Sequence, residues 1–470
     1  MEKLCFPCNM KLKINPATLY SRWMVLLSFV VLLVCSILII NSPLIGNITT
    51  TLTNLASITQ RPTTIPFNCN VANLTCPSIN ITSHTLPPSS SCPEYFRWIH
   101  EDLRPWAETG ITQDAIMRAK KEASFRLIIS NGRPYFELYR HVFQTRDVFT
   151  IWGILQLLRR YPGRVPDLDL MFNCGDMPVI KAANYKAVSA PIPPPLFRYC
   201  RDDATMDIVF PDWSFWGWIE LNIKPWEALL KEIKKENEKL KWIDRLPYAF
   251  WKGNPNVSHK RQELLSCQSR KGFKSSNLAK QCTHRYKIYI DGRAWSVSEK
   301  YILACDSPTL FVNTRFQDFF TRGLIPGHHY WPIPRNNLCR SIKFAVDWGN
   351  SHQKEAQTIG KTASRFIQEE MSMDHVYDYM LHLLTEYSKL LTYKPVVPPR
   401  AVEYCSESMA CGKKGLMKRF MMDSMVKSVH DKGPCAMPPP YDPGELQEFL
   451  TMKANSTKQI EDLPKKALQH

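Results

Sequence analysis

Charged side chains are absent from one early segment of this 470-residue chain, residues 24–40, which excludes an ordinary water-facing element. At about 1.5 Å per residue, a helix of this length spans roughly 25 Å, enough for a thin bilayer. The flank before it carries four basic residues and one acid: Lys3, Lys11, Lys13, Arg22 and Glu2. By the positive-inside rule, the sequence predicts a cytosolic tail, residues 1–23, and a type II signal anchor. A cleaved signal peptide is the alternative, but “IINSPLIGN” is a poor cleavage site.

Charge is also scarce in the next segment, where Arg61 is the only Lys, Arg, Asp or Glu between residues 41 and 93. Thr, Ser, Asn and Pro dominate, and such a composition cannot bury enough apolar surface to order itself. The sequence therefore predicts an unstructured, glycosylated stem over residues 41–91. Five N-glycosylation sequons fit a lumenal position: Asn47, Asn73, Asn80, Asn256 and Asn455.

The sequence also lacks the ligand spacing of a zinc site, because no CxxC pair is accompanied by a second such pair or by a pair of histidines. Of the 15 cysteines, the 12 that follow residue 68 would stand in an oxidising lumen, where disulfides persist. Cys69 and Cys76 bracket a short loop. Cys282 and Cys305 bracket a strand, a loop and a helix, and a disulfide between them would hold that loop rigid.

After the predicted tail, anchor and stem, roughly 380 residues remain, more than usually pack around one hydrophobic core. Two packed lobes are therefore expected, residues 92–235 and 236–395, followed by a C-terminal extension, residues 396–470. The formal net charge of +17 suggests an anionic partner such as a nucleotide, an acidic polymer or a membrane surface. A merely basic, soluble surface would carry the same charge.

Strands and helices alternate along these lobes. A helix is expected after Thr112, which would cap it, and a hairpin at Asn131-Gly132. A long helix in “HVFQTRDVFTIWGILQLLRRYPG” should end at Pro162-Gly163, and an apolar strand follows in “DLDLMF”. One long helix or two are expected in “QTIGKTASRFIQEEMSMDHVYDYMLHLLTEYSKLL”. No internal repeat is visible, and the alternation predicts α/β lobes with parallel sheets.

Polar residues follow three of the expected strands, and ligands of parallel sheets bind beyond the carboxyl ends of strands. The first is Asp176 in “FNCGDMPVI”, which follows an apolar strand and a glycine. A carboxylate placed there could deprotonate a hydroxyl nucleophile. An Asp that merely caps a turn is the alternative. Three other carboxylates occur nearby in the chain: Asp202, Asp203 and Asp212.

The second strand end is “FWKGNPNVSHKRQELL”, residues 250–265. Lys252 and Arg261 flank a loop with Gly253 and Asn254, and this loop opens a helix. Backbone N–H groups at a helix start and an arginine fork both suit an anion such as phosphate. A basic surface turn is the alternative.

The third strand end is the break in “YKIYIDGRAWSVSEKYILACDSPTLFV”. Gly292 permits a close backbone approach, Arg293 offers a fork, Trp295 a stacking face, and Ser296 and Ser298 offer hydroxyls. One of the two serines could instead cap the next helix, and capping alone is the alternative.

Aromatic residues are dense in “FPDWSFWGW”, which contains Trp213, Trp216 and Trp218. Aromatic faces at this density suit the rings of a sugar acceptor. A corner of the hydrophobic core is the alternative.

Five motifs in this order resemble glycosyltransferase family 90: “GDMPVI”, “FPDWSFWGW”, “FWKGNPN”, “YKIYIDGRAWSVSEKYILACDS” and “DFFTRGLIPGHHYWPI”. The family includes Rumi-type protein O-glucosyltransferases and fungal capsule-associated xylosyltransferases, and the chain looks closest to the plant membrane-anchored branch. The resemblance implies a GT-B fold of two Rossmann-like lobes around a cleft, a UDP-sugar donor, inversion at the anomeric carbon and no metal or other cofactor.

The same resemblance implies roles for individual residues. The family's catalytic Asp falls on Asp176. Its donor-binding positions fall on Asn254, Arg261 and the loop Arg293, Ala294, Trp295, Ser296, Val297 and Ser298. Lys252 stands where Rumi-type enzymes have an arginine, and Ser298 stands where they have their donor-loop arginine. These differences leave the donor sugar open.

These observations predict a single-pass type II Golgi membrane glycosyltransferase with a lumenal catalytic domain. It would transfer xylose or glucose to a hydroxyl of a glycan or glycoprotein, without a nucleic-acid partner. The C-terminus “KKALQH” is not an endoplasmic-reticulum retention signal, so the anchor would set the location, with the endoplasmic reticulum as the alternative. A non-catalytic carbohydrate-binding protein that keeps the family fold is the competing hypothesis.

Overall fold

The computed structural model describes residues 63–70, 76–77, 90–187, 189–267, 278–312 and 314–466. The chain divides into two units, Met1–Thr63 and Thr64–His470, and every element below belongs to the second. The predicted tail and the predicted anchor, residues 24–40, lie outside the described residues. Of the helices that are described, none has both the length and the apolar character needed to cross a bilayer.

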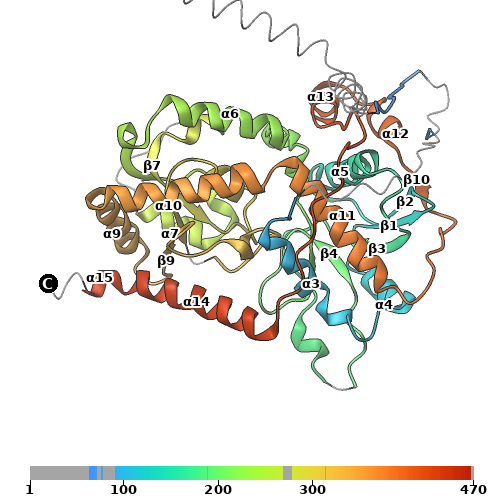
Figure 1. Ribbon diagram of the computed structural model, residues 1–470, viewed down its shortest axis with the longest axis horizontal. Coiled ribbons are helices and arrows are strands. Elements are labelled where there is room, and N and C mark those ends of the chain that lie inside the picture. Colours follow the sequence, from blue (N-terminus) through green and yellow to red (C-terminus); the bar gives the residue numbers. More distant parts are fainter. Residues whose placement is uncertain are drawn as a thin grey trace, which may run out of the picture. The chain divides into compact units, whose positions relative to one another are not determined.

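The described strands form two sheets (Figure 1). The first sheet has the order β10-β2-β1-β3-β4-β5, and the second has the order β6-β7-β8-β9. Their bounds are β1 Phe125–Ser130, β2 Arg133–Leu138, β3 Leu168–Phe172, β4 Leu196–Arg198, β5 Ile208–Val209, β6 Leu246–Phe250, β7 His284–Ile290, β8 Thr309–Val312, β9 Trp331–Ile333 and β10 Val402–Glu403.

The first sheet is mixed rather than parallel. The predicted hairpin is confirmed, because β1 and β2 are antiparallel and Ser130 pairs with Arg133. The two turn residues adopt left-handed backbone angles, φ 52° at Asn131 and 73° at Gly132, as a tight two-residue turn requires. Strand β3 is also antiparallel to β1, whereas β3, β4 and β5 run parallel. The expectation of a parallel sheet therefore fails here, because the hairpin reverses the chain.

The second sheet is parallel throughout, as predicted. Strand β7 lies inside it and contributes to both hydrophobic cores. Tyr286, Ile288 and Ile290 pack in the smaller core, and Tyr289 packs in the larger one. A strand that is covered on both faces consists of a nearly continuous run of apolar residues. Such runs are why the strands of this sheet could be predicted from the sequence.

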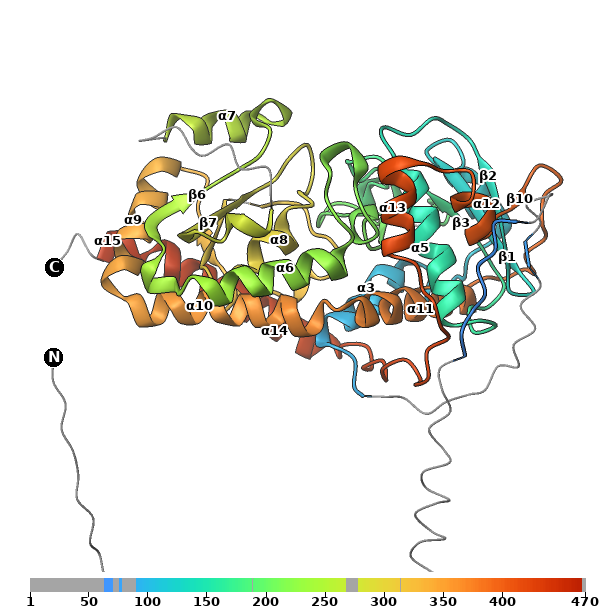
Figure 2. The same ribbon diagram turned by 90° about the horizontal axis from the view of Figure 1, so that it is seen from above.

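Helices cover the sheets (Figure 2). Thr112 caps α4 as predicted, since its hydroxyl accepts a hydrogen bond from the N–H of Ala115. The long C-terminal helical segment is two helices, α10 and α11, joined by a π turn over Phe366–Glu370. The helices are α3 Trp98–Leu103, α4 Gln113–Ala119, α5 Arg146–Arg160, α6 Trp226–Lys239, α7 His259–Ser266, α8 Glu299–Leu303, α9 Leu338–Ser351, α10 Gln353–Arg365, α11 Met373–Lys389, α12 Ser406–Ala410, α13 Gly415–Asp423, α14 Pro443–Glu461 and α15 Leu463–Lys466.

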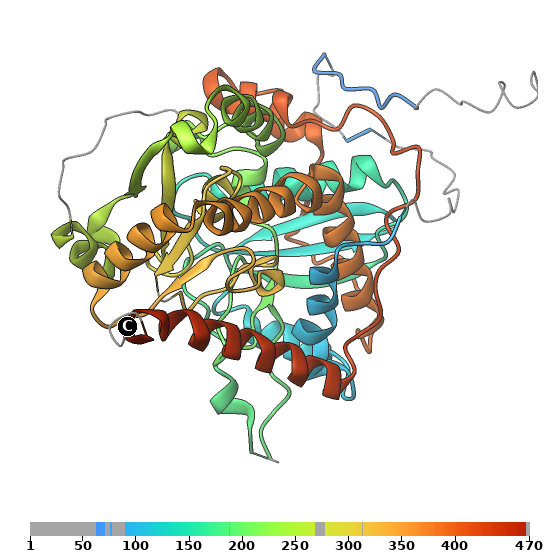
Figure 3. The ribbon, with the colours of Figure 1, turned by 60° about the vertical axis from the view of Figure 1, so that its left-hand side comes forward.

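Two helical segments, α10–α11 and α14, link the elements around the first sheet to those around the second. Helix α10 contacts α8 and α9 near the second sheet, whereas α11 contacts α3, α5 and β3 of the first. Helix α14 begins where Glu445 pairs with Arg97 at 2.5 Å and then reaches β9 of the second sheet (Figure 3). The C-terminal extension therefore supplies a strand to the first sheet and a helix to the second.

Part of the predicted stem is ordered, contrary to expectation. Ile65 is buried, and its backbone oxygen accepts a hydrogen bond from Arg159. Cys69 and Cys76, which bracket a short loop, are each joined to the C-terminal extension, in the disulfides Cys69–Cys411 and Cys76–Cys405. These cross-links compensate for the small apolar content of the segment, a contribution that its composition alone cannot reveal.

The disulfide Cys282–Cys305 is present as predicted, with a sulfur–sulfur distance of 2.05 Å. It joins the residues just before β7 to the residues just after α8. The loop between this strand and this helix is therefore held at both ends.

Candidate active site

Asp176 lies in the loop that follows β3, and hydrogen bonds from the chain around it fix this loop. Asn173 Oδ1 accepts from the N–H of Gly175 at 2.7 Å. The buried carboxylate of Asp207 accepts from the N–H groups of Val179 and Ile180 at 3.0–3.1 Å. The backbone before Asp176 is also bonded to β4, because the N–H of Asn173 donates to the oxygen of Phe197 at 3.0 Å. The backbone after Asp176 is anchored to Asp207, the residue just before β5.

The Asp176 side chain is held on one oxygen. Arg146 Nη1 donates to its Oδ1 at 2.7 Å, and the Asp176 side chain is 32% exposed. No hydrogen bond among the described residues engages the second oxygen, Oδ2. The carboxylate is thus oriented and still accessible, which is the arrangement that a general base needs.

Arg261 organises the predicted donor site from within. Its guanidinium donates to the backbone oxygens of Asp291 (2.9 Å), Ile290 (3.1 Å) and Asn254 (3.2 Å), and to Ser296 Oγ (3.1 Å). A guanidinium has five N–H donors, so one remains for a ligand. Burial lowers the pKa of Arg261. Its main contribution is to hold the end of β7 against the loop that precedes α7, residues 251–258.

The loop that precedes α7 contains Gly253. A Cβ atom on Gly253 would lie 2.7 Å from the ring of Trp251, so a larger residue there would displace this ring. Asn254 Oδ1 accepts from the N–H of Asn256 at 3.0 Å. Lys252 and Asn254 are exposed, so the loop presents a cation and an amide to solvent beside the buried Arg261.

The loop between β7 and α8 divides into exposed and buried residues. Arg293 is exposed, and no ion pair or hydrogen bond among the described residues holds its side chain. Ala294 and Trp295 are buried, and Ser296, Val297 and Ser298 are partly buried. Arg293 is thus the side chain of this loop that is most available to an anion.

The two serines of the loop bond to each other. Ser296 Oγ lies 2.9 Å from Ser298 Oγ, and Ser298 makes no side-chain bond to the N-terminus of α8. The capping alternative is therefore wrong. The expected close approach at Gly292 is not enforced either, because a Cβ atom there would lie at an ordinary 3.4 Å from the oxygen of Trp295.

Buried carboxyl groups lie beneath this loop. Burial raises the pKa of Asp291 to about 6 and that of Asp318 to about 6. Burial, reinforced by the charge of Asp318, raises the pKa of Glu299. Thr321 Oγ1 lies 3.1 Å from Glu299 Oε1 and 2.8 Å from Asp318 Oδ1. Since a hydroxyl has one hydrogen, this geometry fits a protonated Glu299 that donates to Thr321.

The tryptophans predicted to bind the acceptor are mostly core residues. Trp216 is fully buried, and its Nε1 donates to Tyr377 Oη at 2.9 Å. Trp213 is also buried. A side chain without exposed surface cannot stack on a sugar, so the acceptor role is wrong for both. Trp218 is partly exposed and donates to Gln144 Oε1 at 3.0 Å, and its acceptor role stays a prediction.

The loop that contains Asp176 and the loop that contains Trp295 approach the same group of side chains, although 119 residues separate Asp176 from Trp295 in the chain. Cys200 Sγ donates to the backbone oxygen of Asp176 at 3.3 Å. Burial raises the pKa of the Cys200 thiol, and the nearby backbone N–H of Trp295 lowers it in part. The Trp295 ring lies 5.6 Å from Tyr199 and 6.2 Å from Trp213. Trp213 also lies 4.6 Å from the guanidinium carbon of Arg146, the side chain that bonds Asp176, so it links Arg146 to the Trp295 loop.

Arg146 and Cys200 were not identified in the sequence. One signal was present for Arg146, because a cation in the first turn of a helix opposes the helix dipole and suggests a partner elsewhere. Cys200 carried no such signal, since a buried thiol and a disulfide cysteine look alike in one sequence.

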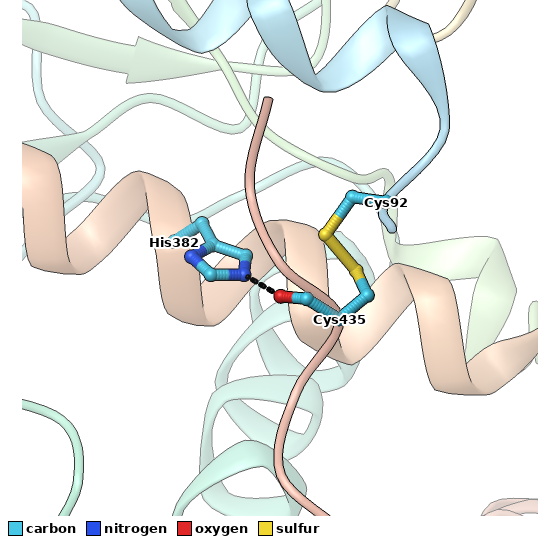
Figure 4. Close-up of side chains that lie close together, drawn as sticks. All are labelled: Cys92, His382 and Cys435. Carbon is cyan, nitrogen blue, oxygen red and sulfur yellow. Dashed lines mark hydrogen bonds between the residues drawn. A yellow bond between two sulfur atoms is a disulfide. The ribbon is translucent and has the colours of Figure 1, made fainter. Parts of the chain in front are cut away.

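One group of potential metal ligands occurs among the described residues, formed by Cys92, His382 and Cys435 (Figure 4). The two sulfurs are bonded to each other, and His382 Nε2 lies 2.8 Å from the backbone oxygen of Cys435. Burial lowers the pKa of His382. This group is therefore a disulfide with a neutral histidine beside it, and it ties the start of the folded part to its C-terminal extension.

Comparison with known proteins gives a consistent result. The family model described as Glycosyl transferase family 90 matches residues 87–464, which include both sheets. O-glucosyltransferase rumi of Drosophila melanogaster is 25% identical over 342 residues, covering 66% of this chain and 80% of that protein. The O-glucosyltransferase rumi homolog of Anopheles gambiae is 25% identical over 334 residues (65% and 80%). Protein O-glucosyltransferase 1 of Homo sapiens is 24% identical over 348 residues (67% and 85%).

Proposed function

This chain belongs to glycosyl transferase family 90 and is a glycosyltransferase, and we propose that it transfers glucose or xylose from a UDP-sugar to an acceptor hydroxyl. The names of the relatives, which are O-glucosyltransferases, support glucose and a glycoprotein acceptor. The departures at Lys252 and Ser298 keep xylose and a glycan acceptor in the proposal. The family match favours an enzyme over a non-catalytic carbohydrate-binding protein.

In the proposed reaction Asp176 is the general base. The acceptor oxygen attacks the anomeric carbon as the bond from that carbon to the diphosphate oxygen breaks. The acceptor proton passes to Asp176 Oδ2, and UDP leaves with the bonding electrons, so the configuration inverts. The chain of contacts from Asp176 through Arg146 and Trp213 to Trp295 supports this proposal, because it links the proposed base to the loop proposed to bind the donor.

The donor's negative charge would be met by protein groups instead of a metal ion. Arg293 and Lys252 would approach the diphosphate from solvent, and the loop N–H groups would add hydrogen bonds. Arg261 would act mainly by holding the two loops that carry these groups. Rates unchanged by EDTA would support this proposal, whereas loss of activity that a divalent cation restores would contradict it.

We also propose a GT-B arrangement for the fold. The first sheet would belong to the acceptor-side lobe and the second sheet to the nucleotide-sugar lobe, with the boundary near residue 235. Because α11 contacts α3, α5 and β3, it would belong with the first lobe, although its residues were expected in the segment 236–395.

A screen of the purified lumenal fragment, residues 63–470, against UDP-sugars would test the function. Release of UDP from UDP-glucose or UDP-xylose, increased by added glycan or glycoprotein acceptors, is the expected result. Absence of UDP release from every donor, by a folded protein, would contradict the proposal.

The proposed location is the Golgi membrane, with residues 24–40 as a single-pass type II anchor. Protease added to intact microsomes is then expected to remove only the residues before the anchor, because the folded part would lie in the lumen. Immunoblotting with antibodies to either end of the chain would read this out. Digestion of the folded part in unbroken vesicles would refute the type II orientation.

Two arginine variants are expected to differ. Arg293→Ala should weaken UDP binding by roughly 10- to 150-fold and leave the melting temperature unchanged, because an exposed donor to the diphosphate is lost. Arg261→Ala should weaken UDP binding and also lower the melting temperature, because four internal hydrogen bonds are lost. Calorimetric titration with UDP and thermal melts would measure both. Normal UDP affinity in both variants would mean that the donor site lies elsewhere in the protein.

A further inference from the structure

Arg146 occupies a position that local rules disfavour. It is the first residue of α5, where the unpaired N–H groups of the helix already create positive potential. Its side chain is only 8% exposed, and its Nε has no hydrogen-bond partner. A purely structural helix start would not need a buried cation with an unsatisfied donor.

The contacts of Arg146 point to Asp176. Its Nη1 lies 2.7 Å from Asp176 Oδ1 and 3.4 Å from the backbone oxygen of Cys174. The guanidinium carbon lies 4.6 Å from the centroid of the Trp213 ring and 5.2 Å from that of Phe143. Two aromatic rings therefore hold the planar guanidinium, and its free end bonds the carboxylate.

The backbone of Asp176 is restrained independently. The bond from Cys200 fixes its carbonyl, and the bonds from Val179 and Ile180 to Asp207 fix the residues that follow. The freedom that remains is rotation of the carboxyl group about its side-chain bonds. The bond from Arg146 to Oδ1 restricts this rotation and leaves Oδ2 without a hydrogen bond among the described residues.

We infer that Arg146 is a positioning residue that orients the Asp176 carboxylate so that Oδ2 receives the proton of the acceptor hydroxyl. This inference rests on the proposed function, in which Asp176 is the base. Arginine is suited to the task because a planar fork both stacks on Trp213 and bonds a carboxylate, whereas lysine offers a point charge. The Arg146 side chain is nearly buried and bonds Asp176, so its effect would pass through Asp176.

A double-mutant cycle tests the inference. In the UDP-sugar assay, Arg146→Met should lower turnover roughly 10- to 100-fold with little change in the donor KM, because a charge-assisted hydrogen bond to the base is lost. The turnover of Arg146→Lys should lie between that of the wild-type protein and that of R146M. The variant D176N/R146M should be no slower than D176N alone, since a residue that acts only through Asp176 has nothing more to lose.

Arg160→Met is the matched control, because Arg160 lies on the same helix and pairs with Asp374 at 2.8 Å, away from Asp176. It should retain turnover. Equal losses in R146M and R160M, normal turnover in R146M, or a further loss in the double variant would each overturn the inference.

The outcome remains distinguishable from failure of the proposed function itself. Absence of donor turnover in the wild-type protein, or full activity of D176N, refutes the function or the base. In that case a crystal structure of R146M still decides the positioning role. The Asp176 carboxyl group should be rotated or disordered, and an unchanged orientation would overturn the inference.

Discussion

Replacing Asp176 by asparagine is expected to lower glycosyl transfer at least about 100-fold, the usual contribution of a general base. Asparagine keeps the size of aspartate and accepts the bond from Arg146 through its amide oxygen, but it cannot take up a proton. UDP affinity and the melting curve should stay close to those of the wild-type protein. Transfer rates at saturating donor, calorimetric titration with UDP and thermal melts would measure the three quantities.

The structure sharpens the interpretation of this variant. Two of the nearby carboxylates are buried in ion pairs, Asp202 with Arg315 at 2.6 Å and Asp212 with Lys300 at 2.7 Å, whereas the Asp176 side chain is 32% exposed beside Arg146. Asp203 is exposed and serves as the control, so Asp203→Asn should retain transfer. Normal transfer in D176N would mean that Asp176 only caps a turn, since asparagine caps about as well as aspartate. Asp203 would then be the next base to test.

Breaking the buried ion pair between Lys300 and Asp212 is expected to destabilise the fold by about 3–5 kcal/mol. Both side chains are buried, and Lys300 Nζ lies 2.7 Å from Asp212 Oδ2. The pair joins the segment after β5 of the first sheet to α8, which follows β7 of the second. In Lys300→Met, the Asp212 carboxylate would stay buried without its partner. Denaturant unfolding would measure the loss.

The pH dependence of this contribution follows from Lys300. Burial is the largest single influence and lowers the pKa of Lys300, but the charge of Asp212, its hydrogen bond and the charges of Tyr301 and Asp318 together leave the pKa raised. A raised lysine pKa stabilises the fold at every pH below the unfolded-state value of about 10.4, and the contribution is lost as the pH rises through the folded-state value. The wild-type pair should therefore contribute fully at neutral pH.

Two variants test whether the unpaired charge causes the loss. D212N/K300M should be less destabilised than K300M, because no buried charge remains without a partner. Lys231→Met removes an exposed pair with Glu227 on α6 and should change stability by less than about 0.5 kcal/mol. A loss in K300M as small as that in K231M would mean that the pair contributes little.

The fold was predictable where short-range pattern decides the structure. The cap at Thr112, the hairpin at Asn131-Gly132, the apolar strand before Asp176 and the parallel second sheet all follow from neighbouring residues. The antiparallel part of the first sheet follows from the predicted hairpin, although a parallel sheet was expected. The addition of β10 was missed, because its residues 402–403 come more than 260 positions after its partner β2. A single sequence contains no signal for such pairing.

The candidate site follows from the sequence at the same level of detail. Strand ends indicated Asp176 and the loops around Arg261 and Arg293, since ligands of parallel sheets bind beyond the carboxyl ends of the strands, and their roles stay predictions. The burial of Trp213 and Trp216 was not predictable. An aromatic residue suits a sugar site and a core equally well, and only the surrounding packing separates the two.

By itself, the sequence determined the α/β class, several elements in their order and the disulfide Cys282–Cys305, because these depend on patterns among residues close in the chain, and its five ordered motifs determined the family. Only the tertiary structure decided which residues meet across the chain. It placed Arg146 on Asp176, turned four donors of Arg261 inward and bound the stem cysteines to the C-terminal extension. These contacts join residues tens to hundreds of positions apart, and the energy that selects them comes from packing and hydrogen bonding in the folded state, which no local pattern encodes.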